Sequence, residues 1–599
     1  MKSLAGGACR LVTFVLFLCR IANADIPSSS AINFSVLGNY ASAANGGGSN
    51  VTVDRAVARG WERFTITDRT NPSLADGDII WLQAQNGDYL SAECGGGDGT
   101  GAPDGTVCGN VDANRTEARS WETFTIIKLG GSSGSLIQSS DQVAFLSLLG
   151  NYCSAENGGG PGSIMDCTRS QVGRWETWTL TVAPTPTVTA NLDSTGAIVP
   201  ANFVGFSNEE TDVIPDAIFT PGNTSLINLL RLLGPSGVWR IGGNNSDTTP
   251  AAPALTQQIA NDVQAFISAV GPGWTVIYGL DSVINDAGIA VTHASYLINA
   301  FPSGNIAFQF GNEPDYEIGE AAWISVFDSY YDALTAAYPT ARVGGPDTGS
   351  LDNLNYIDAT RHGRSSVQYL TGHKYTLGCT PVSATADQVV ADAQVSSNPG
   401  VTISEFGIIC GGGQRGITDR LLAATYYLRL AQSAFSSGFR GILPHNVLVP
   451  IDWGDGNPPR SSYYNQFILQ GDGGYSPAPM FYGMYLFSQL LGQTSVSTTT
   501  SSLSSLVTVN ATLGPNGSAN ILVVNGDTTQ GIAVQPQQTR PWSTANVYVL
   551  SGQGCDDPSP VLNGVAIGEG GSWAGSAAVI NNGDSVSIPP CGAALIQIQ

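Results

Sequence analysis

A threefold internal repeat near the N-terminus constrains the fold of this chain more than any other feature. In each copy a Gly-Asn-Tyr or Gly-Asp-Tyr step precedes three consecutive glycines, and a Trp-Glu-x-aromatic motif follows. The tyrosines of the three copies are Tyr40, Tyr89 and Tyr152. The flanking segments are short, alternate in polarity and end in turn residues, which is typical of β-strands. Three copies of a four-strand unit predict a β-trefoil over residues 25–183.

The tryptophans that open the Trp-Glu motifs, Trp61, Trp121 and Trp175, are interpreted as packing in the trefoil core. The repeat resembles those of fascin-like and ricin-type trefoils, and this resemblance implies a unit that binds sugars or proteins. The glycine-rich loops, each near a tyrosine, are its candidate sugar sites.

The chain has 599 residues, which predicts two or three packed domains rather than one. Only 12% of its residues are charged, and the net charge is −23 at pH 7. The sequence contains three lysines, Lys2, Lys128 and Lys374. Because a surface so poor in cations repels a polyanion, we exclude nucleic acid as a partner.

The first 24 residues have the form of an export signal. Lys2 and Arg10 precede the apolar run Leu11 to Leu18, and residues 22–24 (Ala-Asn-Ala) have the small-x-small form of a cleavage site. The apolar run is too short to span a membrane. We therefore expect residues 1–24 to be a signal peptide, and the mature protein to be secreted and free of membranes.

The remaining eight cysteines are an even number, which favours a disulfide framework in an exported protein. Their spacing favours four pairs, although eight cysteines allow many others: Cys94 with Cys108, Cys153 with Cys167, Cys379 with Cys410, and Cys555 with Cys591. Seven sequons suit a secreted glycoprotein, and they begin at Asn33, Asn50, Asn114, Asn223, Asn244, Asn510 and Asn516.

The pattern of the sequence changes after a short Pro-Thr linker at residues 184–189. Apolar strand-like segments then alternate with helical stretches, of which residues 321–337 and 418–436 are the clearest. This alternation predicts a (β/α)8 barrel over residues 190–489. Residues 490–599 are rich in Ser, Thr and Val in short alternating segments, and they are expected to form an antiparallel β-sandwich.

Two glutamates follow predicted barrel strands, at the face where such barrels place their active sites. Glu313 lies in the sequence FQFGNEPD directly after one strand, and Glu405 follows the strand Val401 to Ile403. A single glutamate of this kind is often only a solvated or ion-paired acid. Glycoside hydrolysis, however, needs one carboxylic acid to protonate the leaving oxygen and one carboxylate to attack the anomeric carbon. The pair therefore predicts a glycosidase active site.

Residues 200–492 resemble glycoside hydrolase family 79, the β-glucuronidase and heparanase family, in the Asn-Glu-Pro motif and in the segment after Glu405. The resemblance implies a (β/α)8 barrel with a β-sandwich beside it. It implies that Glu313 is the acid/base, that Glu405 is the nucleophile and that Asn312 binds the 2-hydroxyl group of the sugar. Gly411 and Gly412 fall at the family's glycine pair, whose backbone N–H groups hold the carboxylate of the substrate.

The same resemblance implies three further substrate-binding residues. Tyr375, in a His-Lys-Tyr segment, corresponds to a tyrosine that hydrogen-bonds the nucleophile. Asn244 ends an Arg-Ile-Gly-Gly-Asn segment and is expected to line the pocket, which would leave its sequon sterically unused. Glu209 is expected to bind sugar hydroxyls, with Asn208 and Glu210 as alternatives.

The sequence departs from the family at two places. Cys410 stands where family members carry a tyrosine before the glycine pair, and Phe481, with Tyr482 beside it, stands at another expected tyrosine. Both departures weaken the expectation of uronate recognition but not that of glycoside cleavage. A disulfide between Cys379 and Cys410 is expected to fix the glycine loop in compensation.

These features predict a secreted retaining glycosidase that removes terminal β-glucuronic acid, free or 4-O-methylated, through a covalent glycosyl-enzyme intermediate. Such a mechanism predicts a carboxylate separation of roughly 5–5.5 Å. One alternative is a heparanase-like endo-enzyme, which needs a basic cleft that so few cations hardly supply. The others are a neutral-sugar glycosidase of the same clan and a glycan-binding lectin or adhesin with a degenerate barrel. In each case the partner is an oligo- or polysaccharide. No metal or organic cofactor is expected, because the four histidines and the cysteines lack zinc-site spacing.

Overall fold

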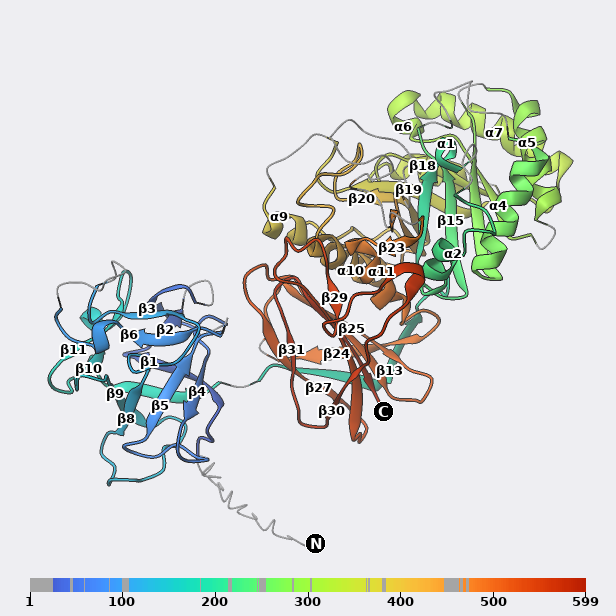
Figure 1. Ribbon diagram of the computed structural model, residues 1–599. Coiled ribbons are helices and arrows are strands. Elements are labelled where there is room, and N and C mark those ends of the chain that lie inside the picture. Colours follow the sequence, from blue (N-terminus) through green and yellow to red (C-terminus); the bar gives the residue numbers. More distant parts are fainter. Residues whose placement is uncertain are drawn as a thin grey trace, which may run out of the picture. The chain divides into compact units, whose positions relative to one another are not determined.

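The computed structural model of the protein is drawn in Figure 1. It describes residues 25–599 except residues 44–46, 59, 86, 100–106, 184, 214–217, 245, 247–254, 283–284, 302–303, 362–363, 365–366, 380–383, 447–462, 464–466, 470–472 and 502. The expected signal peptide, residues 1–24, lies outside the described residues. The chain divides into two compact units, Met1–Pro184 and Thr185–Gln599.

The first unit is built from twelve short strands in one antiparallel sheet. The strands are β1 (Ser30–Val36), β2 (Asn39–Ala43), β3 (Ser49–Arg55), β4 (Phe64–Asp68), β5 (Ile79–Gln83), β6 (Tyr89–Ala92), β7 (Val111–Arg115), β8 (Phe124–Lys128), β9 (Gln142–Leu146), β10 (Tyr152–Ala155), β11 (Met165–Arg169) and β12 (Trp178–Val182).

The pairing of these strands repeats three times along the chain. In each copy the first strand pairs with the second and the fourth, and the second pairs with the third, as in β1–β2, β1–β4 and β2–β3. The copies join through β4–β5, β8–β9 and β12–β1. The threefold repeat in the sequence is therefore a threefold repeat of strand pairing.

The expectation that Trp61, Trp121 and Trp175 fill the core of this unit is wrong, because all three are only half-buried. The aromatic residue three positions later is the one that is fully buried. It opens the fourth strand of each copy, where its side chain is the first to face inward: Phe64, Phe124 and Trp178.

The glutamate of each Trp-Glu motif has a structural role in the first unit. It is nearly fully buried and faces the arginine that ends the third strand of its copy. The nitrogen–oxygen distances are 3.8 Å for Arg55–Glu62, 3.9 Å for Arg115–Glu122 and 3.9 Å for Arg169–Glu176. Since a buried carboxylate is costly unless it is paired, these contacts explain why the motif recurs.

The second unit contains an eight-stranded parallel sheet whose order follows the chain, with β14 at one edge and β21 at the other. Isolated bridges Val204–Ile442 and Ser207–His445 link the two edges, so that the sheet nearly closes into a barrel. The strands are β14 (Gly205–Glu209), β15 (Ser236–Gly242), β16 (Gly273–Leu280), β17 (Ile306–Phe310), β18 (Arg342–Thr348), β19 (Val367–Tyr375), β20 (Val401–Gly407) and β21 (Gly441–Pro444).

Helices alternate with the barrel strands, as the sequence pattern predicts. In α7 the buried residues Trp323, Phe327, Tyr330 and Leu334 recur at helical spacing and form one apolar face. The helix α10 is buried on almost every side because it also contacts α11 and the C-terminal strands β25 and β26. The helices are α1 (Glu210–Val213), α2 (Thr224–Arg231), α4 (Gln257–Val270), α5 (Ala287–Ala300), α6 (Pro314–Glu317), α7 (Glu320–Ala337), α8 (Leu354–Arg361), α9 (Ala386–Ala391), α10 (Leu421–Ser436) and α11 (Pro479–Ser488).

A ten-stranded, sandwich-like sheet completes the second unit. Its strands are β13 (Thr187–Ile198), β24 (Thr494–Thr500), β25 (Val507–Leu513), β26 (Ala519–Asn525), β27 (Ile532–Gln538), β28 (Thr544–Ser551), β29 (Val561–Leu562), β30 (Ala578–Asn581), β31 (Val586–Ile588) and β32 (Ala593–Ile598). A separate hairpin joins β22 (Phe467–Leu469) to β23 (Tyr475–Pro477).

The strand β13 differs from the sequence expectation. Residues 187–189 were expected in the linker and residues from 190 onward in the barrel. Instead β13 pairs with β24 and β27, and in Figure 1 it lies among the strands of the C-terminal sheet. The alternation of buried and half-buried residues from Thr187 to Leu192 is that of a strand with one buried face, which explains the pairing.

The four expected cysteine pairs are present as disulfides: Cys94–Cys108, Cys153–Cys167, Cys379–Cys410 and Cys555–Cys591. Within the part of the chain that the structure describes, no helix has the length and apolar character needed to cross a membrane.

Candidate active site

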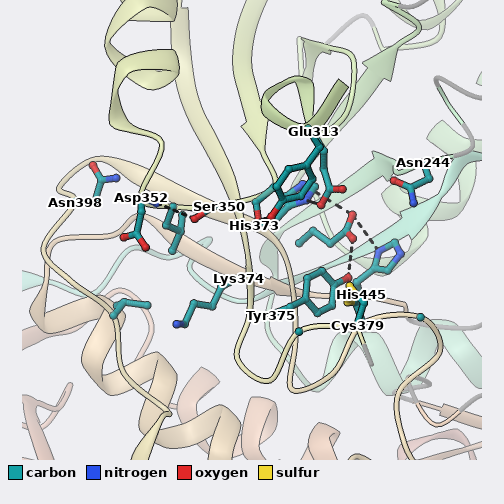
Figure 2. Close-up of a pocket in the computed structure, with 18 of the residues that line it drawn as sticks. Asn244, Glu313, Ser350, Asp352, His373, Lys374, Tyr375, Cys379, Asn398 and His445 are labelled. Atoms are coloured by element: carbon teal, nitrogen blue, oxygen red, sulfur yellow. Dashed lines mark hydrogen bonds and ion pairs between the residues drawn. A yellow bond between two sulfur atoms is a disulfide. The ribbon is translucent and has the colours of Figure 1, made fainter. Parts of the chain in front are cut away.

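A cavity of about 950 Å³ lies at the carboxyl ends of the barrel strands. Residues at the ends of seven strands or just after them line it, from Glu209 of β14 to His445 after β21. In Figure 2, Tyr375, His373, Glu313 and His445 gather at one end of this cavity. The face of the barrel is the one that the sequence predicts for the active site.

Glu313 projects into the cavity from the turn between β17 and α6. Its backbone is left-handed, with φ of +45°, and its N–H donates a hydrogen bond of 2.9 Å to the carbonyl oxygen of Asp347. A left-handed conformation is unfavourable for a residue with a side chain and persists only where the surroundings hold it. The turn therefore fixes the direction of the Glu313 carboxyl, whose side chain remains 21% exposed.

Glu405 lies within β20 and its carboxylate is held from two sides. The Tyr375 hydroxyl donates a hydrogen bond of 2.6 Å to Oε1, and the Arg240 guanidinium donates one of 2.5 Å to Oε2. Burial alone raises the pKa of the Glu405 carboxyl, but His445, His373, Arg240 and Tyr375 outweigh burial and lower that pKa to about 2. Glu405 is therefore an ionised carboxylate at neutral pH.

His373 joins the two glutamates. Its Nδ1 lies 2.9 Å from Oε1 of Glu313, and its Nε2 lies 3.2 Å from Asp347 and 3.9 Å from Glu405. Burial lowers the pKa of this imidazole, but the negative charges of Asp347 and Glu405 outweigh it and raise the pKa to about 10. His373 is consequently a buried cation at neutral pH, and its Nδ1–H donates to Glu313.

Arg240 lies beneath the cavity, fully buried, and ties the site to the barrel interior. It donates to Oδ1 of Asn312 at 2.6 Å and to the Ser207 hydroxyl at 3.1 Å, and it also pairs with Asp347. Burial raises the pKa of the Asp347 carboxyl, but Arg240 and His373 hold it well below its usual range. Two cations thus balance two buried carboxylates, which is the condition for burying charges at all.

The arrangement supplies two carboxyl groups in opposite surroundings. Glu405 is buried against cations and stays charged, whereas Glu313 is more exposed and touches one histidine. One oxygen of each glutamate and one nitrogen of His373 lie within 4.8 Å of one another. This triplet has metal-ligand residue types, and a metal bound there would have to displace the proton of the His373 imidazolium.

The structure brings most of the expected site residues together. Glu209, Asn244, Tyr375 and Gly411 line the cavity with the two glutamates. Asn312 lies behind them and donates through Nδ2 to Asn244 at 2.8 Å. Gly412 is buried and is not among the lining residues.

The alternatives to Glu209 point elsewhere. Asn208 is fully buried and accepts a hydrogen bond from Trp239, and Glu210 pairs with the Tyr278 hydroxyl. Phe481 and Tyr482 do not line the cavity either; both are buried, and the Tyr482 hydroxyl accepts a hydrogen bond from the backbone of Ile567.

Several residues of the site have no role in the sequence analysis, namely Arg240, Asp347, His373 and His445. Arg240 lies in the Arg-Ile-Gly-Gly-Asn segment and His373 in the His-Lys-Tyr segment, but neither residue was expected to act in the site. Asp347 lies near the carboxyl end of β18, and His445 directly follows β21 with its Nε2 3.4 Å from Glu209. A polar residue at the carboxyl end of an apolar barrel strand was the signal that would have found them.

The disulfide Cys379–Cys410 borders the cavity beside Gly411. It joins the segment after β19 to the segment after β20. Gly411 and Gly412 both have left-handed backbones, with φ of +70° and +99°, which favours glycine.

No protein-family model and no curated protein matches the sequence. Among solved structures, a 4-O-α-L-rhamnosyl-β-D-glucuronidase from Fusarium oxysporum 12S, in complex with Rha-GlcA, is 16% identical with a TM-score of 0.52; the match covers 68% of this chain and 100% of that one. An α-L-arabinofuranosidase from Thermotoga maritima is 11% identical over 69% of this chain and 99% of its own, with a TM-score of 0.51. A family 51 α-L-arabinofuranosidase from Bifidobacterium longum is 11% identical over 70% of this chain and 100% of its own, also at 0.51. The chain thus shares the TIM-barrel-like fold of these glycoside hydrolases.

Proposed function

We propose that this protein is a secreted retaining glycoside hydrolase of family 79 that removes terminal β-glucuronic acid, free or 4-O-methylated, from glycans. The observation that carries the proposal is the contrast between the two glutamates, one buried and charged, the other in contact with both cavity and His373. A buried, charged carboxylate suits the nucleophile, and a carboxyl group that faces the cavity is placed to exchange a proton with the glycosidic oxygen.

In the first step of this mechanism Glu405 attacks the anomeric carbon, the bond from that carbon to the glycosidic oxygen breaks, and Glu313 gives its proton to that oxygen. In the second step Glu313 takes a proton from a water molecule whose oxygen attacks the same carbon, and the ester bond to Glu405 breaks. One oxygen of Glu313 lies within 4.8 Å of one oxygen of Glu405, which supports a retaining mechanism, since inverting enzymes separate their carboxyl groups by roughly 6.5–9.5 Å.

The buried cations have positioning roles in this mechanism. Arg240 and Tyr375 hold the Glu405 carboxylate in one orientation, and Arg240 also holds Asn312, proposed to bind the 2-hydroxyl group. The His373 imidazolium orients Glu313. None of these groups needs to move during the reaction, and preorganised polar groups of this kind stabilise developing charge well.

The uronate preference rests on the loop that begins at Gly411. Gly411 lines the cavity, and no other atom lies near the position that a Cβ of this residue would occupy. A substrate carboxylate can therefore approach its backbone N–H closely. The Cys379–Cys410 disulfide anchors this loop at the position where the family has a tyrosine. The Fusarium enzyme of similar fold is a glucuronidase, which favours the same substrate, whereas the arabinofuranosidases favour a neutral sugar.

Hydrolysis of chromogenic β-glucuronide and β-glucoside at mildly acidic pH tests this function. We expect turnover of the glucuronide, its loss in Glu405→Gln and normal turnover in Glu320→Gln, an exposed acid at the start of α7. Turnover of the glucoside alone would instead establish the neutral-sugar glycosidase. Inactivity on both substrates, with a folded protein, would leave an endo-enzyme or a lectin.

We further propose that residues 25–183 form a β-trefoil that binds glycans, and that residues 190–489 and 490–599 are the catalytic barrel and the sandwich, with β13 joined to the latter. Two half-exposed tryptophans support the glycan proposal, because Trp121 packs beside Gly95 and Trp175 beside Gly158 of the glycine loops. An exposed indole face beside a loop without side chains suits a sugar ring. Glycan-array binding by the full chain should fall in Trp121→Ala and Trp175→Ala; an unchanged array would remove this proposal.

A further inference from the structure

Tyr316 is an exposed aromatic residue at the mouth of the catalytic cavity. It lies in α6, three residues after Glu313, lines the cavity and is 67% exposed. One edge of its ring packs on Gly349, so closely that a Cβ at position 349 would overlap the ring, and its hydroxyl donates to the Gly349 carbonyl at 3.3 Å. The ring is therefore held in place while most of its surface faces solvent.

A set of polar side chains lines the cavity away from the Glu405 carboxylate. In Figure 2, Lys374 points away from Tyr375 and His445, on the side of the cavity where Asp352 and Asn398 lie. Ser350 also lines the cavity, and its hydroxyl accepts a hydrogen bond of 3.2 Å from the backbone N–H of Asp352. This side therefore offers an ammonium donor, a carboxylate acceptor, an amide and a hydroxyl.

The reaction chemistry predicts that the leaving group occupies this side of the cavity. The leaving group departs on the side of the acid that protonates it, which is Glu313, and Tyr316 and Gly349 adjoin Glu313 in α6 and after β18. A cavity of about 950 Å³ is at the upper end of the roughly 300–1,000 Å³ typical of small-ligand pockets, so it holds more than one sugar ring.

We infer that Tyr316, Ser350, Asp352, Lys374 and Asn398 form a leaving-group subsite that binds a neutral pyranose, with Tyr316 as its stacking platform. This inference rests on the proposed function, and it adds the class of residue to which the glucuronic acid is linked. Sugar C–H groups stack on aromatic faces, and the polar set matches a ring that carries hydroxyls as both donors and acceptors.

The balance of charged side chains at this subsite favours a neutral sugar. Lys374 is the only lysine of the sequence beyond residue 128, and Asp352, which lines the same side of the cavity in Figure 2, carries the opposite charge. One cation and one anion give no net attraction for a sulfated or carboxylated residue, and the chain as a whole is strongly acidic. A sulfated leaving-group sugar is accordingly disfavoured.

The test compares two donors of the same glucuronosyl group. One is the disaccharide in which β-glucuronic acid is linked 1→6 to galactose, and the other is β-glucuronosyl fluoride, whose leaving group is a single atom that needs no subsite. For Tyr316→Ala we expect kcat/KM to fall about tenfold or more on the disaccharide and less than about threefold on the fluoride, the difference being the lost stacking contact. Tyr316→Phe should keep the wild-type ratio, and Ile289→Ala, an exposed apolar residue of α5, is the surface control.

Two further measurements test the leaving-group subsite. Galactose added as an acceptor should intercept the glucuronosyl–Glu405 ester in wild type, its hydroxyl giving a proton to Glu313, and this transfer should be lost in Tyr316→Ala. Equal loss on both donors, or unchanged transfer, would overturn the subsite. If wild type cleaves neither donor, the proposed function fails. The subsite is then decided by saturation-transfer NMR with methyl β-galactoside, whose signals must weaken in Tyr316→Ala and Lys374→Met.

Discussion

Replacing His373 by glutamine should remove a large pH dependence from the stability of this protein. Its imidazole has a pKa of about 10 in the folded chain against 6.5 for an ordinary histidine, because Asp347 and Glu405 outweigh the effect of burial. A group whose pKa is raised by folding stabilises the fold fully below its unfolded pKa, and that stabilisation is lost as the pH rises towards its folded pKa. The window is therefore pH 6.5 to 10.

The size of the effect follows from those two pKa values. Proton linkage makes His373 worth on the order of 4–5 kcal/mol at pH 6 and about 1.5 kcal/mol at pH 9, so about 3 kcal/mol is lost between them. In His373→Gln the titrating group is absent and this loss should disappear. The variant is also expected to be less stable at pH 6, because Asp347 and Glu405 lose the His373 cation and keep their ion pairs with Arg240.

Urea unfolding of both proteins at pH 6 and pH 9 measures the difference directly, since the first unit and all other titrating groups are common to both. His293→Gln serves as the control. Burial lowers the pKa of His293, so this group titrates below pH 6.5 and outside the window. If wild type and His373→Gln lose the same stability between the two pH values, to within about 0.5 kcal/mol, the assignment of His373 as a buried cation is refuted.

Three further predictions concern the same site. Tyr375→Phe removes the hydroxyl that donates to Glu405, so the pKa of Glu405 should rise and the acidic limb of the kcat/KM profile should move up by about 1–2 pH units; a limb that stays in place contradicts this. Arg240→Met leaves Asp347 and Glu405 short of a cation and should cost about 3–5 kcal/mol in urea unfolding, whereas Arg231→Met, on the exposed side of α2, should cost under about 0.5 kcal/mol. Cys379→Ser should lower stability by up to about 4 kcal/mol, from the entropy of a loop whose ends are 31 positions apart in the sequence, and raise KM for the glucuronide; an unchanged KM would separate the glycine loop from substrate binding.

The sequence predicted best where a local signal decides the structure. The repeat in residues 25–183 predicted repeated strand pairing, because each copy carries its own turns, alternation and paired glutamate. Cysteine spacing predicted all four disulfides. The prediction that Trp61 and its equivalents fill the core failed, because aromatic character alone does not say which of two neighbouring aromatics faces inward; the strand start at Phe64 does.

The boundary at β13 shows a second kind of limit. Residues 187–198 read as linker and barrel from their position in the chain, yet their partners in β24 lie some 300 residues away. Such a pairing leaves little trace in the strand itself, because any strand with one buried face can join any sheet of matching pattern.

For the active site, the sequence by itself determined that two glutamates at the ends of barrel strands, Glu313 and Glu405, are available for chemistry, since strand ends of a parallel barrel meet at one face whatever the details. Only the tertiary structure decided the electrostatic surroundings of each glutamate. The low pKa of Glu405 comes from His445, His373 and Arg240, and the cationic state of His373 comes from Asp347 and Glu405. In each case the groups belong to different strands or the loops after them, and they act over a few ångströms in a buried, weakly polarisable environment. Charge interactions of this kind depend on distances in space, and distances between strands are set when the barrel closes, not by the order of residues along the chain.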